Sequence, residues 1–287
     1  MHMAVTFKPG SPIWCSGCGH FGVESALKQS LNNLSIEPHE AMVLAGIGCS
    51  GTIQNYIGCY GYHALHGRVL PTATGVAAAN PALTVIAAGG DGDGYAIGCG
   101  HLIHTIRRNP SLLYIVMNNG TYGLTKGQPS PTAVDRADQE HAVDAIQLAL
   151  TIPGSTFLAR GYVGQIRQLV SLVDAALTHV RNKCGFAFLE VISPCVTYND
   201  NYPSWRELLV NLDSDDSYDC GDRTAAIANY ARLTAEGRLP GGLIYQGSAT
   251  TFEDAIGVTV KNSPACQDLS VSRHIDRYRK QMDMYAI

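Results

Sequence analysis

Charged residues are scarce in this sequence of 287 residues, and long apolar runs are absent. Charged side chains make up only 15% of the residues, which suggests that part of the surface is covered by another chain. The net charge of −4 and the lack of a basic run argue against nucleic acid as a partner. No apolar stretch reaches the roughly 20 residues that span a bilayer, so we predict no membrane association.

The N-terminus lacks the basic and then apolar pattern of a signal peptide, which predicts a cytoplasmic protein. Nine cysteines are nevertheless present. In the cytoplasm they are not expected to form a disulfide framework, because that compartment keeps thiols reduced. Metal or redox chemistry is the better explanation for them.

Short apolar runs alternate along the chain with longer stretches of helical periodicity. The runs predicted as strands are residues 42–47, 83–88, 112–117, 155–159 and 187–192. The stretches predicted as helices are residues 22–34, 97–108, 139–150, 164–181 and 224–236. Continuous apolar strands that alternate with helices predict an α/β fold, with a mostly parallel sheet and helices on both of its faces. Such a sheet binds its ligands at the carboxyl ends of its strands.

The composition changes near residue 200, after which Asn, Asp, Ser and Tyr become frequent. We therefore divide the chain into a domain at residues 1–200 and a C-terminal loop and helical tail at residues 201–287. The tail is expected to pack on the core or on a partner. All of the motifs described below that point to chemistry lie in the first part.

A glycine-rich turn with the sequence GGDGDG occupies residues 89–94, directly after a predicted strand. Glycines let backbone N–H groups approach a phosphate closely, and the N-terminus of the following helix adds a favourable dipole. A carboxylate beside a phosphate repels it unless a cation lies between them, so Asp91 predicts Mg²⁺. Asn119 ends the next strand, and the intervening residues suffice for one helix and one strand. The two strand ends should therefore be neighbours.

This turn departs from two other phosphate-binding patterns. Tyr95 stands where the dinucleotide fingerprint has its third glycine, and the pair Lys126-Gly127 reverses the order of a Walker A loop. A pair of ordinary turns is the remaining structural alternative.

The strings GDGDGYAIGCGHLIHTIRRN and NNGTYGLTKGQPSPT resemble the β subunits of 2-oxoacid:ferredoxin oxidoreductases. The resemblance spans essentially the whole chain and implies that residues 1–200 bind thiamine diphosphate and a [4Fe–4S] cluster. It implies that Asp91, Asn119 and the Thr121 carbonyl bind Mg²⁺, and that Gly90 and Gly92 cradle the diphosphate. The other residues that it places at the cofactor are Gly48, Cys49, Ser50, Asp93, Tyr122, Gly123, Leu124 and Thr125.

Three further residues are predicted near the reacting atoms. Lys126 lies in the string TKGQ and is expected to contact the diphosphate or a substrate carboxylate, with a solvated loop lysine as the alternative. His66 and Arg68 belong to an HGR string that the resembled family has near its active site. Arg68 has the geometry to hold a carboxylate by two hydrogen bonds, and an ordinary surface arginine explains it equally well.

Four cysteines are predicted to meet at the same sheet edge. Cys15 and Cys18 form a CxxC motif, which alone fits thiol redox, zinc or iron–sulfur chemistry. Cys49 and Cys195 each follow a predicted strand. Four thiolates there suit a [4Fe–4S] cluster, and zinc is the chief alternative because it accepts the same ligands. The resembled family binds its cluster through this pattern, so we assign all four cysteines to one cluster.

The resemblance implies the coenzyme A-dependent oxidative decarboxylation of a 2-oxoacid, in the oxidative or the CO₂-fixing direction. We favour 2-oxoglutarate as the substrate, with pyruvate or a broad range of 2-oxoacids as the alternative. Thiamine diphosphate supplies the carbon chemistry, and the cluster passes the electrons to ferredoxin. The sequence contains no second thiamine-type domain and no ferredoxin-type run of cysteines. A separate α subunit is therefore expected to supply the activating glutamate, and this chain a single cluster.

Two functions from other classes stay open. A non-oxidative thiamine-diphosphate decarboxylase would keep Asp91 and Asn119 but would not need four converging cysteines. A binding module stabilised by zinc or a cluster would keep the cysteines. It would have no use for a GDG turn and an Asn pair at neighbouring strand ends.

Overall fold

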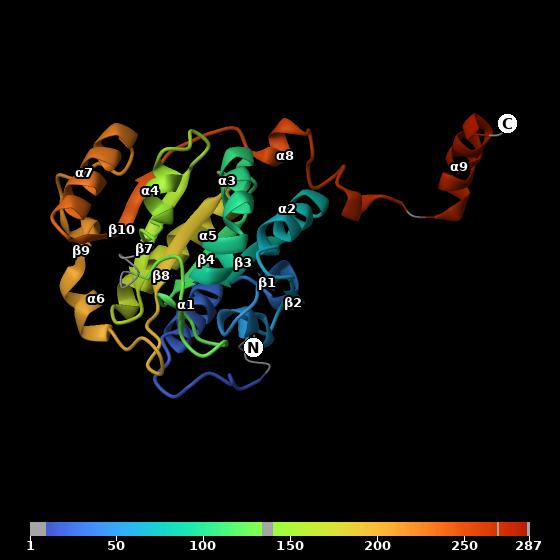
Figure 1. Cartoon of the computed structure of the whole chain (residues 1–287). Coiled ribbons are helices and arrows are strands. Elements are labelled where there is room, and N and C mark those ends of the chain that lie inside the picture. The colour runs from blue at the N-terminus through green and yellow to red at the C-terminus, as the bar shows by residue number, and fades with distance from the viewer. Residues whose placement is uncertain (1–9, 134–139, 269, 286–287) are drawn as a thin grey trace, which may run out of the picture.

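The chain folds around one large sheet, and a computed structural model describes residues 10–133, 140–268 and 270–285 (Figure 1). The strands are β1 Ala41–Ala45, β2 Tyr60–His63, β3 Thr84–Gly90, β4 Leu113–Asn118, β5 Thr121–Tyr122, β6 Gln128–Pro129, β7 Phe157–Tyr162, β8 Ala187–Ile192, β9 Leu209–Asn211 and β10 Leu239–Gln246. The α-helices are α1 His20–Asn33, α2 Val69–Ala79, α3 Cys99–Arg108, α4 Ala145–Leu150, α5 Ile166–Arg181, α6 Tyr202–Leu208, α7 Arg223–Ala235, α8 Phe252–Ala255 and α9 Val271–Tyr285.

The large sheet has eight strands in the order β2-β1-β3-β4-β8-β7-β10-β9. The six strands from β2 to β7 in this order are parallel, and β10 runs antiparallel to β7. The five strands predicted from apolar runs are the central β1, β3, β4, β7 and β8. The predicted α/β fold with a mostly parallel sheet is therefore confirmed.

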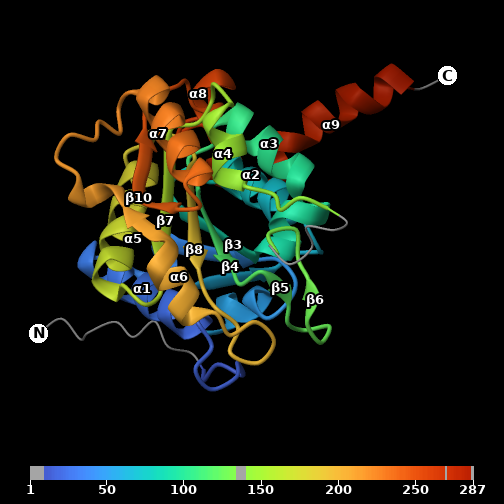
Figure 2. The same cartoon turned by 60° about the vertical axis from the view of Figure 1, so that its left-hand side comes forward.

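Helices cover both faces of the sheet, which explains why its central strands read as continuous apolar runs. Strands β4, β7 and β8 are buried at every position. Figure 2 shows α1 and α5 on one side of the sheet and α3, α4 and α7 on the other. Helix α5 buries Leu169, Val173, Ala176 and Val180, whose spacing forms one apolar face. None of the described helices is long and apolar enough to cross a lipid bilayer.

Several elements were not predicted from the sequence, among them β2, α2, β9 and β10. Strand β2 has the sequence YGYH and is exposed throughout, as befits an edge strand without an apolar run. Helix α2 contains Pro71 and Gly75, and β10 contains Pro240 and two glycines, all of which favour turns in a sequence reading. Short β9 pairs with β10.

The region after residue 200 contributes β9 and β10 to the sheet and then extends away from it. Helix α9 projects from the rest of the molecule (Figures 1 and 2). The predicted division at residue 200 stays a prediction. The helix predicted over residues 139–150 begins at Ala145, and residue 139 lies outside the described residues.

The register of the parallel strands aligns their carboxyl ends. Ala45 of β1 pairs with Ala88 of β3, and Gly90 of β3 pairs with Met117 of β4. Likewise, Asn118 at the end of β4 pairs with the last residue of β8. The segments that follow β1, β3, β4 and β8 therefore meet at one edge of the sheet, where a ligand is expected.

Candidate functional site

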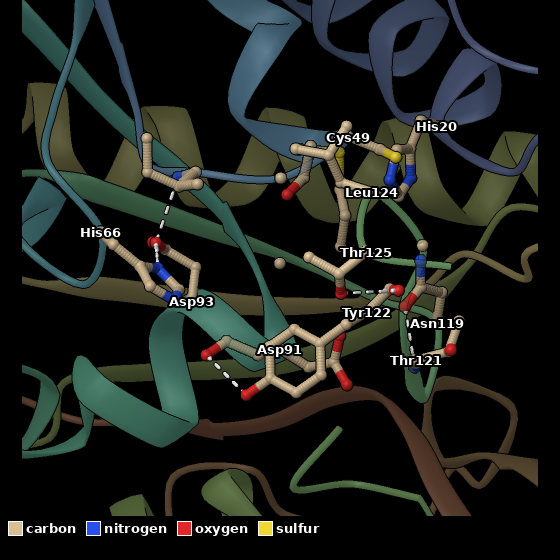
Figure 3. A pocket seen from close by; sticks show the side chains of 17 residues that line it. His20, Cys49, His66, Asp91, Asp93, Asn119, Thr121, Tyr122, Leu124 and Thr125 are labelled. Atoms are coloured by element: carbon tan, nitrogen blue, oxygen red, sulfur yellow. Dashed lines mark hydrogen bonds and ion pairs between the residues drawn. The ribbon is translucent and has the colours of Figure 1, made fainter. Parts of the chain in front are cut away.

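Two adjoining cavities open at this edge. The first, the cofactor cavity, has a volume of about 190 Å³ and is lined by the segments after β1, β3 and β4 (Figure 3). The second, the thiol cavity, has a volume of about 300 Å³ and is lined by Cys15, Cys18, Cys49 and Cys195. The residues that line both cavities form their shared wall: His20, Ile47, Gly48, Cys49, Asn119, Gly123 and Leu124.

Asp91 follows β3 directly and lines the cofactor cavity with only 1% of its surface exposed. The hydroxyls of Ser130 and Thr132 both donate to its Oδ2 atom, the latter at 2.5 Å. Burial raises the pKa of Asp91, while these hydrogen bonds act to lower it. A buried carboxylate of this kind gains from a cation placed beside it, as a magnesium site requires.

Asn119 directly follows β4 and Thr121 begins β5, and both line the cofactor cavity. The Thr121 N–H donates to the Asn119 side-chain oxygen at 3.0 Å, which leaves that oxygen a second lone pair for a metal. Asn199 donates to the Asn119 carbonyl at 2.8 Å and so fixes this turn. The predicted ligands Asp91, Asn119 and Thr121 thus line one cavity.

Asp93 joins two loops of the site. Its Oδ1 atom accepts hydrogen bonds from His66 Nδ1 at 2.6 Å, from the Gly67 N–H at 2.8 Å and from the Ile47 N–H at 3.1 Å. Its Oδ2 atom is buried without a partner among the described residues. Figure 3 shows this group at one end of the pocket, with Cys49 and His20 at the other. Asp93 therefore positions His66, and its contact with a cofactor stays a prediction.

Gly90 and Gly92 allow a close approach of the backbone in the cofactor cavity. A Cβ atom at Gly92 would lie 2.1 Å from the Tyr122 ring, and one at Gly90 would lie 2.9 Å from the Ser50 hydroxyl. Gly92 also begins a π-helical turn, Gly92–Ile97, of the kind that occurs frequently at functional sites. Glycine is therefore needed at both positions to admit Tyr122 and Ser50, which line the same cavity, and the contact of the two glycines with a diphosphate stays a prediction.

The remaining predicted cofactor contacts also line this cavity: Gly48, Cys49, Ser50, Tyr122, Gly123, Leu124 and Thr125. Lys126 and Arg68 line neither the cofactor cavity nor the thiol cavity. Lys126 sits in the β5–β6 loop with a φ of +78°, an unusual backbone conformation for a residue with a side chain. The Arg68 guanidinium contacts His101 Nε2 at 2.8 Å on the surface. The catalytic roles of Lys126, His66 and Arg68 stay predictions.

The four predicted cluster cysteines surround the thiol cavity as free thiols. Burial is the main cause that raises the pKa of Cys18 to about 11; the charges of the other three cysteines add to this shift, and a hydrogen bond from the His20 backbone opposes it. A Cβ atom at Gly123 would lie 3.5 Å from Cys49 Sγ and 3.9 Å from Cys195 Sγ. The described residues contain no set of three or more ligands close enough to hold one metal ion. The identity of the metal that these four thiols would bind stays a prediction.

Several residues of the site were not identified from the sequence. His20 lies in the shared wall with 1% exposure, and burial lowers its pKa to about 4. Trp14 donates from its ring nitrogen to the Cys49 carbonyl at 2.7 Å. Ser130 and Thr132 hold Asp91 from 39 and 41 residues away in the sequence. The closeness of His20 to the CxxC motif in the sequence was the available signal for its place in the site. No sequence pattern marked the hydroxyls of Ser130 and Thr132.

A buried polar network lies behind the cofactor cavity. The Asn118 side-chain oxygen lies 2.9 Å from the Thr132 hydroxyl, and its amide donates to Glu190 at 3.2 Å. Glu190 also accepts from Arg160 Nε at 2.5 Å and from the Tyr95 hydroxyl at 2.8 Å. Arg160 and Glu190 are only 2% and 1% exposed, so this ion pair supports the cavity from the sheet interior.

Two family models match the chain in succession. Residues 46–191 match the thiamine pyrophosphate enzyme, C-terminal TPP binding domain. Residues 195–261 match the pyruvate ferredoxin oxidoreductase beta subunit, C terminal. The first match contains the loops of the cofactor cavity, and the second begins at Cys195.

Similar proteins cover most of the chain. The 2-oxoacid:ferredoxin oxidoreductase subunit beta of Saccharolobus solfataricus is 38% identical over 275 residues, 89% of this chain and 88% of that protein. The 2-oxoglutarate synthase subunit KorB of Methanocaldococcus jannaschii is 38% identical over 194 residues, 65% of this chain and 70% of that protein. A solved structure of 2-oxoglutarate:ferredoxin oxidoreductase from Magnetococcus marinus, with 2-oxoglutarate, coenzyme A and succinyl-CoA bound, matches with a TM-score of 0.80 and 34% identity, over 89% of this chain and 92% of that one. The chain therefore belongs to the β subunits of the 2-oxoacid:ferredoxin oxidoreductases.

Proposed function

We propose that this chain carries thiamine diphosphate, Mg²⁺ and one [4Fe–4S] cluster, and that it takes part in the coenzyme A-dependent oxidative decarboxylation of a 2-oxoacid. The observation that carries the proposal is the shared wall between the cofactor cavity and the thiol cavity. Cofactor and cluster would be separated there by single side chains such as Leu124 and His20. A non-oxidative decarboxylase has no use for the second cavity, and a zinc module has no use for the first.

The residues of the cofactor cavity would divide the binding of magnesium and diphosphate. Asp91, the Asn119 side chain and the Thr121 carbonyl would hold Mg²⁺, with Ser130 and Thr132 keeping the Asp91 carboxylate in place. Gly90 and Gly92 would bring backbone N–H groups to the diphosphate. When bound, thiamine diphosphate supplies the carbon centre that attacks the 2-oxoacid, and the cluster accepts electrons one at a time.

An α subunit is the partner that we propose to cover both cavities and to supply the activating glutamate. Large apolar side chains beside the cavities support a partner, since Leu124 is 62% exposed and Ile13 is 81% exposed. Tyr60 and Tyr62 on the edge strand β2 add further exposed aromatic surface. Ferredoxin would receive electrons from the cluster, and coenzyme A would take the acyl group.

We favour 2-oxoglutarate as the substrate, in the oxidative or the CO₂-fixing direction. The KorB relatives and the Magnetococcus structure carry 2-oxoglutarate in their names, which supports this choice. Pyruvate is the second candidate, because the family model over residues 195–261 is named for a pyruvate enzyme.

Purification of the chain with its α subunit in the absence of oxygen tests the proposal. We expect a brown complex whose iron and sulfide contents correspond to one [4Fe–4S] cluster per chain, with an EPR signal on reduction. Cys195→Ser should lose this signal, whereas Cys266→Ser, at an exposed cysteine outside the cavity, should keep it. A colourless complex that contains zinc would refute the proposal. Ferredoxin reduction with 2-oxoglutarate or pyruvate, each with coenzyme A, then identifies the substrate.

A further inference from the structure

The His20 imidazole lies in the wall between the two cavities. His20 begins α1, follows Cys18 by two residues and lines both the cofactor cavity and the thiol cavity. Figure 3 shows its ring at the same end of the pocket as Cys49. Of the residues in the shared wall, His20 has the one side chain with a ring N–H to offer.

The hydrogen bond to Ser193 assigns the tautomer of this ring. His20 Nδ1 lies 2.7 Å from the Ser193 hydroxyl, which is fully buried. In the described part of the chain the Ser193 hydroxyl has no other hydrogen-bonding partner. A buried hydroxyl must use its hydrogen, so Ser193 donates to Nδ1. The proton of the neutral ring then resides on Nε2.

Nε2 is the end of the ring that is left for a ligand. The hydrogen bonds among the described residues include none to this atom. The ring cannot swing freely, because Trp14 packs edge-on against it with 5.5 Å between the ring centroids. An N–H donor fixed in the wall of a cavity and lacking a protein partner is suited to an acceptor inside that cavity.

The residues that contact the His20 ring lie in the same segments of the chain as the predicted cluster cysteines. Trp14 precedes Cys15, and Ser193 precedes Cys195 by two residues. The backbone N–H of His20 hydrogen-bonds the Cys18 thiol, which lowers the pKa of that thiol. A group anchored in this way keeps its position relative to the thiols rather than to the cofactor loops.

We propose that His20 Nε2–H donates a hydrogen bond to a sulfur of the [4Fe–4S] cluster and thereby raises the reduction potential of the cluster. This inference rests on the cluster of the proposed function. A hydrogen bond to a cluster sulfur stabilises the reduced state more than the oxidised state, because reduction adds negative charge to the sulfurs. His20 is thus a positioning and tuning residue for electron transfer, with Ser193 fixing its tautomer.

Four variants of the complete αβ complex, purified without oxygen, test this proposal. His20→Phe keeps an aromatic ring but removes the donor, and His20→Gln restores an N–H at a similar reach. His179→Phe is the matched control, since His179 is also buried and bonded to a hydroxyl but lines neither cavity. The measurement is the midpoint potential of the cluster, obtained by a redox titration followed by EPR.

We expect a more negative midpoint potential for His20→Phe, a return toward the wild-type value for His20→Gln and no change for His179→Phe. Ser193→Ala should give a smaller shift in the same direction, which keeps the test available where His20→Phe does not fold. An intact cluster with an unchanged potential in both His20→Phe and Ser193→Ala would overturn the role of His20 alone. A wild-type complex without a [4Fe–4S] signal would instead overturn the proposed function.

Discussion

Replacing Gly92 by alanine should weaken the binding of thiamine diphosphate while leaving the fold intact. The new Cβ would lie 2.1 Å from Cε1 of Tyr122 and 2.7 Å from two further atoms of that ring. The Tyr122 ring lines the cofactor cavity, so we expect its displacement to change the shape of the space for the cofactor. Overpacking of this kind costs about 1–3 kcal/mol, which corresponds to a roughly 5- to 150-fold increase in the dissociation constant.

Titration calorimetry of the αβ complex with thiamine diphosphate, at saturating Mg²⁺, measures this effect. Gly100→Ala is the matched control, because Gly100 is an exposed helical glycine of α3 with nothing within 4 Å of its added Cβ. The control should bind the cofactor as the wild type does and should be no less stable, because its added methyl group meets no neighbouring atom. A Gly92→Ala complex that folds and binds within twofold of the wild type would refute the steric reasoning.

Two further predictions concern the core. Arg160→Met leaves Glu190 buried without its ion-pair partner and should lower the free energy of unfolding by about 3–5 kcal/mol in urea titrations. Adding Glu190→Gln should recover part of this loss. The account would be contradicted if the double variant lost more free energy of unfolding than the losses of the two single variants added together. Burial lowers the pKa of His179 from 6.5 to about 4, so between these pH values the unfolded chain binds more protons than the folded chain. Acidification from pH 7 to 4 should therefore lower the free energy of unfolding of the wild type by up to about 3 kcal/mol more than that of His179→Phe. Equal losses in the two proteins would contradict this prediction.

The central sheet could be predicted because its strands are buried on both faces and their apolar runs are uninterrupted. Strand β10 also belongs to this sheet, yet Pro240, Gly241 and Gly242 obscure its pattern. Its antiparallel pairing with β7 depends on tertiary packing and has no signal in the local sequence. Edge strand β2 lacked an apolar run for a different reason, since all four of its residues are exposed.

The candidate site could be predicted where the residue types and spacing of a motif indicate a ligand. The Gly-Asp-Gly turn and the Asn pair imply neighbouring strand ends, and the structure places Asp91 and Asn119 on one cavity. The hydroxyls that hold Asp91 could not be predicted, because Ser130 and Thr132 follow β6 and reach Asp91 only in the folded chain. The place of His20 in the site could not be predicted, because its hydrogen bond to Ser193 spans 173 residues.

The shared wall places one set of residues under the packing requirements of both cavities. Gly123 belongs to the loop that encloses the cofactor cavity, yet a side chain there would first meet the sulfurs of Cys49 and Cys195. A mutation selected for tighter substrate binding on this loop is therefore also tested against the thiols. Diversification of substrate preference should accordingly avoid the wall and accumulate on the far side of the cofactor cavity, around His66 and Thr125.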